Sequence, residues 1–179
     1  MARYAAFLRG INVTGRRTGN PELRARIEEL GFEEVSLFRA SGNVILEATG
    51  RAPEIARRIE QGLAASLGYE VPTYLRSASQ LRAIAAHEPF DPKLVAASKG
   101  KLQVAMLPAR PSKAKQERAL ALATEEDRLA ISDRELYWLP SGRMMETTLD
   151  LKAAEKLLGP WTMRTKGTVE QIAGKYFAA

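Results

Sequence analysis

The sequence predicts an α+β protein with two similar lobes packed together. Residues 1–76 read as strand, helix, strand, strand, helix, strand, and residues 101–166 read in the same order. This βαββαβ order is that of the ferredoxin-like fold, also called the α/β plait. Each copy spans fewer than 80 residues, near the lower limit for independent stability, which predicts that the two copies pack on each other.

The repeated pattern sets the expected domain boundaries. Residues 1–76 form the first ferredoxin-like lobe, and residues 101–179 form the second lobe with a C-terminal helix. Residues 77–100 hold a short connecting helix and a linker, which Pro89 and Pro92 mark.

Alternating apolar residues and helix signals define the elements of the first copy. Strands are expected at 3–8, 34–39, 44–47 and 71–76. Pro21 and Pro53 open two helices, which Gly31 and Gly68 end. Asn20 is the predicted N-cap of the first helix.

The second copy shows the same signals. Strands are expected at 101–107, 129–132, 135–139 and 161–166. Helices are expected from 112 to 120 or 122 and at 150–158. Tyr137, Trp138 and Trp161 are expected to pack in a core or between the lobes. Thr168 is the predicted cap of the terminal helix, with Gln171 completing a capping box.

Cysteine and histidine usage limits the possible chemistry. The chain has no cysteine, which excludes disulfides, thiolate nucleophiles, zinc–thiolate sites and iron–sulfur clusters. His87 is the only histidine, so a histidine-rich metal site is excluded as well. We expect no metal and no cofactor, and the sequence indicates no particular reaction.

The positive charge is concentrated in the second half of the chain. Of the net charge of +6, residues 93–179 contribute +5, from 15 basic and 10 acidic residues. This balance is compatible with an anionic ligand or nucleic acid, although a solvated basic surface is the simpler explanation. The apolar run Tyr4–Leu8 is too short for a signal peptide or a membrane span, so we expect a cytoplasmic protein without a membrane partner.

One edge of the first lobe collects polar residues. In a ferredoxin-like sheet, the end of the first strand, the turn between the second and third strands, and the start of the first helix share an edge. The loop holds Thr14 and the turn holds Gly42. The candidate ligand-binding residues at this edge are Arg9, Asn12, Arg16, Arg39, Ser41 and Asn43.

Those residue types suit a small anionic or phosphate-bearing ligand. Arginine offers a planar fork for phosphate, and a helix N-terminus attracts anions. Glycines let the backbone approach a ligand closely. The alternative is that the asparagines and glycines only form turns and that the arginines are solvated.

Two segments carry a family resemblance. Arg3–Gly15, which reads RYAAFLRGINVTG, and Ser41–Ile45, which reads SGNVI, resemble blocks of the bacterial family Domain of Unknown Function 1697. The similarity covers essentially the whole chain in length and element order. It implies the ferredoxin-like arrangement and brings no established reaction.

The chain departs from that family at three positions. Ala40 stands where the family usually has Gln. The family's block T-x-R-N-W-x-T-V corresponds to Thr162–Val169, with Thr165 and Lys166 in place of Asn and Trp. Arg164 matches the block, so we add it to the candidate ligand-binding residues.

Two alternative functions stay open. The basic C-terminal half suits nucleic acid, although not in the manner of an RRM, because residues 44–47 lack aromatics and Tyr137 and Trp138 lie on opposite strand faces. Both faces of the strands in the first copy are apolar, so the face without helices needs a cover. The second copy of the pattern could supply this cover, and so could another subunit, in a homodimer or a protein-interaction module.

Overall fold

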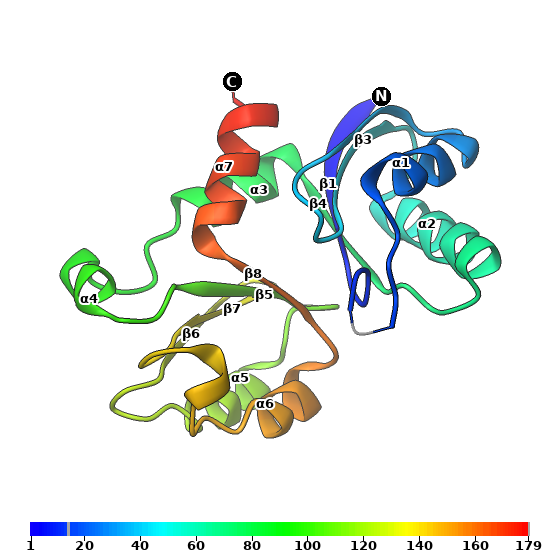
Figure 1. Ribbon diagram of the computed structural model, residues 1–179. Coiled ribbons are helices and arrows are strands. Elements are labelled where there is room, and N and C mark those ends of the chain that lie inside the picture. Colours follow the sequence, from blue (N-terminus) through cyan, green and yellow to red (C-terminus); the bar gives the residue numbers. More distant parts are fainter. Residues whose placement is uncertain (14, 179) are drawn as a thin grey trace. The chain divides into compact units, whose positions relative to one another are not determined.

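The computed structural model describes residues 1–13 and 15–178. It confirms the predicted α+β class and the two lobes, each of which contains a four-stranded antiparallel sheet (Figure 1). The chain divides into two compact units. The first contains Met1–Arg82 together with the chain end from Ile172, and the second contains Ala83–Gln171. The boundaries between units fall inside helices α3 and α7, whereas the expected boundaries lay at residues 76 and 100.

The first unit holds a sheet and two long helices. Its elements are β1 (Ala2–Leu8), α1 (Asn20–Glu29), β2 (Glu33–Leu37), β3 (Asn43–Ala48), α2 (Ala52–Leu67), β4 (Thr73–Ser77) and the start of α3 (Ala78–Ala86). The strand order is β2-β3-β1-β4. β1 lies centrally and pairs antiparallel with both β3 and β4.

Helices α1 and α2 lie side by side and bury their apolar stripes against one face of this sheet (Figure 1). Leu23, Ile59 and Leu63 are fully buried there with Leu8 and Leu46 of the strands. This burial of apolar surface is the main source of stability for the unit.

The chain end completes the first unit. Arg3 donates from Nη1 to the carbonyl oxygen of Tyr176 at 3.2 Å, and Arg82 donates to that of Phe177 at 3.2 Å. The rings of Phe38 and Tyr176 meet edge to face at 6.3 Å. Residues near the end of the chain thus contact residues near its start.

The second unit repeats the pattern of sheet and helices. Its elements are the rest of α3, α4 (Pro92–Ala97), β5 (Gln103–Met106), α5 (Lys113–Leu120), β6 (Arg128–Ser132), β7 (Glu135–Leu139), the 3₁₀ turn η1 (Met144–Glu146), α6 (Leu151–Leu158), β8 (Thr162–Thr165) and the start of α7 (Lys166–Tyr176). The strand order is β6-β7-β5-β8, again antiparallel.

The three aromatic residues predicted for the core are buried. Tyr137 and Trp138 are fully buried on β7, and Trp161 packs in the cluster beneath α5 and α6. The indole N–H of Trp138 donates to Oδ1 of Asp127 at 2.9 Å, which satisfies its only polar group.

Three local predictions were wrong. Gly19, not Asn20, is the N-cap of α1, because the Asn20 amide donates to the carbonyl oxygen of Arg39 at 3.1 Å. The region expected to be a linker contains α4, whose N-cap Asp91 accepts from the backbone N–H of Lys93. Helix α7 follows β8 directly. The hydroxyl of Thr165, not that of Thr168, caps this helix by accepting a hydrogen bond from the backbone N–H of Thr168.

Gly100 is predicted to be required by close packing. A Cβ at this position would lie 2.5 Å from the carbonyl oxygen of Pro140 and 2.7 Å from that of Gly142, both backbone atoms. We expect Gly100→Ala to lower the free energy of unfolding by about 1–3 kcal/mol, as measured by urea denaturation. Gly174→Ala is the control, because that helical position is open and alanine should add up to about 1 kcal/mol. An unchanged free energy of unfolding in Gly100→Ala would contradict this prediction.

Candidate functional site

The loop after β1 and the turn between β2 and β3 lie together, as the sequence predicted. The backbone N–H of Leu8 donates to the carbonyl oxygen of Gly42 at 2.8 Å. The side-chain amide of Asn12 donates to the carbonyl oxygen of Ala40 at 3.1 Å. The structure therefore brings Asn12 against the segment that carries Arg39, Ser41 and Asn43. We call this region the polar edge, formed by residues 9–20 and 39–43.

Left-handed backbone conformations concentrate at the polar edge. Gly10, Asn12, Gly15, Arg39 and Gly42 all have φ between 57° and 79°. Non-glycine residues rarely adopt this region unless surrounding contacts hold them there. Asn12 is held through its Oδ1 atom, which accepts from the backbone N–H of Thr18 at 2.7 Å. Thr14, expected in the same loop, lies outside the described residues.

Asn43 shapes the turn from within. Its side chain is only 1% exposed, and its amide donates to the carbonyl oxygen of Phe38 at 3.0 Å and to Oγ of Ser41 at 2.8 Å. The hydroxyl of Ser41 is thereby oriented at the exposed tip of the turn.

Two candidate arginines present charge at the surface of the edge. The guanidinium of Arg16 stands 4.1 Å from the centre of the Tyr69 ring, and that of Arg39 stands 5.3 Å from the Phe38 ring. Aromatic faces attract cations, so each ring restricts the arginine that lies over it. Arg9 is half-buried, and its backbone N–H donates to the carbonyl oxygen of Pro72.

Arg164 belongs to the second unit, not to the polar edge. Its Nη1 donates to Oγ1 of Thr162 and to the carbonyl oxygen of Met163, both at 2.8 Å. Burial lowers the pKa of the Arg164 guanidinium to about 10, which leaves it charged at neutral pH.

Arg164 also has a counterpart in the first unit. Arg76 on β4 is 2% exposed and donates to the carbonyl oxygen of Leu75, the preceding residue, at 3.0 Å. The next residue in each unit, Ser77 or Thr165, uses its hydroxyl to accept a backbone N–H at the start of the following helix. In each unit, then, the last strand carries a buried arginine next to the residue that caps the following helix. This similarity gives Arg164 a structural role at the end of β8 that needs no ligand.

The three departures from the family pattern have identifiable positions. Ala40 contacts Asn12 through its backbone carbonyl, an interaction that any residue type can supply. Thr165 caps α7 and Lys166 begins that helix with its side chain 8% exposed. The last two positions border a cavity that the sequence did not reveal.

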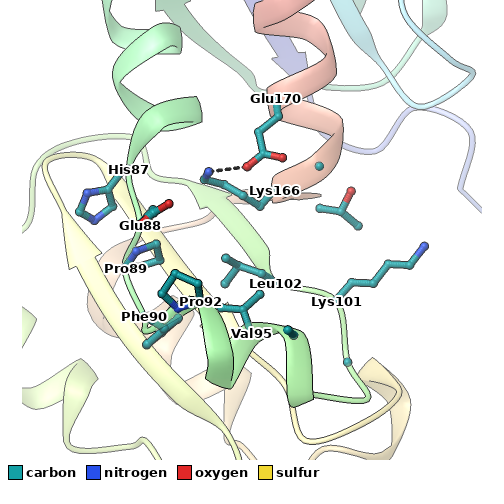
Figure 2. Close-up of a pocket in the computed structure, with 14 residues that line it drawn as sticks. His87, Glu88, Pro89, Phe90, Pro92, Val95, Lys101, Leu102, Lys166 and Glu170 are labelled. Carbon is teal, nitrogen blue, oxygen red and sulfur yellow. Dashed lines mark hydrogen bonds and ion pairs between the residues drawn. The ribbon is translucent and has the colours of Figure 1, made fainter.

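The second unit contains this cavity, with a volume of about 500 Å³ (Figure 2). Two segments line it, 87–102 and 165–170, and they lie far apart in the sequence. The ammonium of Lys166 donates to the carbonyl oxygen of Ala85 at 2.6 Å and to Oε1 of Glu170 at 2.8 Å. Its backbone N–H donates to the carbonyl oxygen of Leu102, which joins the two lining segments.

Fold and site together define a two-lobed α+β protein with an arginine-bearing edge and a separate cavity. The sequence model of the family described as "Protein of unknown function (DUF1697)" matches residues 1–137. The chain belongs to this family.

Among solved structures, the chain is similar to a conserved bacterial protein from Streptococcus pneumoniae, with a TM-score of 0.74 and 20% sequence identity. The alignment covers 97% of each chain. At this identity the likeness shows the fold alone. No curated protein matches the chain.

Residues 1–13 and 15–178 lack two features that would indicate a membrane or metal partner. No helix in this part of the chain is long and apolar enough to cross a membrane. No group of three or more His, Asp or Glu residues within it is arranged to hold a metal ion.

Gly42 is predicted to be essential for the shape of the polar edge. Its φ is +70°, and a Cβ there would lie 3.1 Å from Cβ and 3.2 Å from the carbonyl oxygen of Leu8. We expect Gly42→Ala to cost about 2–4 kcal/mol of unfolding free energy, from the left-handed backbone and the close contact together. Gly15→Ala is the control. Gly15 has φ +79° and no described atom within 4 Å of a Cβ position, so this variant should lose only the backbone contribution of about 1–2 kcal/mol. Equal costs for the two variants would contradict the close approach of Leu8.

Proposed function

We propose that each lobe is a ferredoxin-like plait and that the protein binds a small anionic, phosphate-bearing ligand at the polar edge of the first lobe. The strand orders β2-β3-β1-β4 and β6-β7-β5-β8, with antiparallel pairing throughout, support the plait.

The observation that carries the ligand proposal is that two exposed arginines, Arg16 and Arg39, belong to a loop and a turn whose backbone is held in left-handed conformations. Both side chains are exposed, and their guanidinium groups suit bidentate pairing with phosphate oxygens. Turns that combine right- and left-handed residues direct successive backbone N–H groups to one side, where they attract anions. Asn12 and Asn20 fix the turn by donating to two consecutive carbonyls, so Arg39 is presented by an ordered segment.

Binding of pyrophosphate at low ionic strength tests this proposal. We expect Arg16→Ala and Arg39→Ala each to raise the Kd measured by isothermal titration calorimetry at least tenfold, because each removes a charge-assisted hydrogen-bond donor. Arg57→Ala is the matched control, since Arg57 is an exposed arginine of α2 outside the polar edge and its loss should leave the Kd unchanged. No binding by the wild type, or equal losses in all three variants, would overturn the proposal.

A second candidate function is nucleic-acid binding by the second unit. Lys115, Arg118 and Lys156 border one groove between α5 and α6. None of the three has an ion-pair partner among residues 1–13 and 15–178. Unpaired cations on adjacent helices can contact successive phosphates, which makes this groove the favoured surface for a nucleic acid.

The salt dependence of duplex DNA binding tests this second candidate. Because each phosphate contact releases counterions, the slope of log K against log salt should become shallower by about 0.9 for each of Lys115→Ala, Arg118→Ala and Lys156→Ala. Lys93→Ala, at an exposed position on α4, should leave the slope unchanged. A slope near zero for the wild type would exclude this function. The homodimer and a protein-interaction role stay predictions.

A further inference from the structure

We propose that the cavity of the second unit binds a small cation with an apolar body, the chemical class of alkyl and arylalkyl amines. This proposal goes beyond the anionic ligand of the polar edge, because the cavity belongs to the other unit and shares no residue with that edge. The two ligands also carry opposite charges.

The walls of the cavity favour an apolar body. Apolar side chains from one continuous stretch line it, namely Pro89, Phe90, Pro92, Val95 and Leu102. Its volume of about 500 Å³ falls within the usual range of small-molecule pockets, which are mostly apolar with a few placed polar groups. Transfer of an apolar ring from water into such walls contributes favourably to the binding free energy.

Contacts within the unit hold this wall in place. Asp91 caps α4 by accepting from the backbone N–H of Lys93 at 2.8 Å, which fixes the helix that carries Val95. The ring of His87 packs against the buried ring of Tyr137, with their centroids 4.9 Å apart. A pocket whose walls are ordered before the ligand arrives loses less conformational entropy on binding.

The charge left available in the cavity is negative. Lys166 and Glu170 pair at 2.8 Å, so their charges offset each other, and the Lys166 ammonium also donates to the carbonyl oxygen of Ala85. Figure 2 shows the Lys101 side chain directed away from the other lining residues. Glu88 has no ion pair or hydrogen bond within the part of the chain that the structure describes. We therefore assign the ammonium of the ligand to the Glu88 carboxylate.

A ligand can reach Glu88 and the apolar wall at the same time. Glu88 immediately precedes Pro89 in the chain, so the carboxylate is attached where the apolar wall begins. In the view of Figure 2, Glu88 lies between the Lys166 side chain and the rings of Pro89 and Pro92. An amine on Glu88 with its body along the two prolines needs no charged group on the far side of the cavity.

The same surroundings disfavour an anionic ligand. The carboxylates of Glu88 and Glu170 would repel it, and the Lys166 ammonium already has two acceptors. The start of α7 offers few donors in compensation, since the backbone N–H groups of Lys166 and Thr168 already donate to acceptors within the unit. The sign of the ligand charge is therefore the property to test.

The test compares tryptamine, tryptophol and indolepropionate, which share an indole body and carry a positive, a neutral and a negative head group. We expect the wild-type chain to bind tryptamine, with NMR shifts confined to residues 87–102 and 165–170. Tryptophol should bind about fivefold more weakly at low ionic strength, because it lacks the charge-assisted hydrogen bond, and indolepropionate more weakly still.

Variants separate the charged contact from the apolar wall. Glu88→Gln should weaken tryptamine binding about fivefold and leave tryptophol unaffected. Glu126→Gln is the matched control, since Glu126 is exposed and outside the cavity. Val95→Ser should weaken tryptamine and tryptophol equally, by about fivefold, because it removes apolar contact from both. Leu94→Ser is its control on the same helix, at a position 42% exposed and outside the cavity.

Several outcomes would overturn the proposal. A wild type that does not bind tryptamine would do so, and so would equal affinities for tryptamine and tryptophol. Equal losses in Glu88→Gln and Glu126→Gln, equal losses in Val95→Ser and Leu94→Ser, or NMR shifts that map elsewhere would remove the assigned site. None of these results bears on pyrophosphate binding at the polar edge, so the two proposals fail separately.

Discussion

The hydrogen bond from the backbone N–H of Leu8 to the carbonyl oxygen of Gly42 is the constraint on which the polar edge depends. It continues the pairing of β1 with β3 past the last paired residues and brings the exit of β1 against the turn. A side chain at Gly42 would strain this approach, since both the left-handed backbone and the tight contact with Leu8 disfavour a Cβ. Asn12 and Asn20 contact the same turn, since their side-chain amides donate to the carbonyl oxygens of Ala40 and Arg39.

Most of the fold was predictable because its signals are local. Apolar alternation marked the strands, and proline and glycine marked the ends of α1 and α2. The error at Asn20 arose because a long-range contact prevailed over a local preference: its side chain donates to Arg39 instead of capping its own helix. The α4 helix was missed for another reason. Asp91 and Pro92 form a valid helix start, yet the surrounding prolines resembled a linker.

The two sites differ in how far the sequence reveals them. The polar edge follows from topology, because the strand order dictates which loops meet, and Asn12 does contact the turn that carries Arg39. The cavity has no local pattern, since its lining comes from segments more than sixty residues apart. Its sequence signals are the departures at Thr165 and Lys166, and the meaning of the second depends on knowing that Ala85 and Glu170 accept from its ammonium.

The contribution of the chain end to the first unit affects the order of events during synthesis. Ile172 and Phe177 are buried, and the carbonyl oxygens of Tyr176 and Phe177 accept from Arg3 and Arg82. Residues 1–82 are synthesised well before Tyr176 and Phe177. The lobe that emerges first is therefore completed last, after translation has passed residue 177, and a nascent chain shorter than that leaves Arg3 and Arg82 without these acceptors.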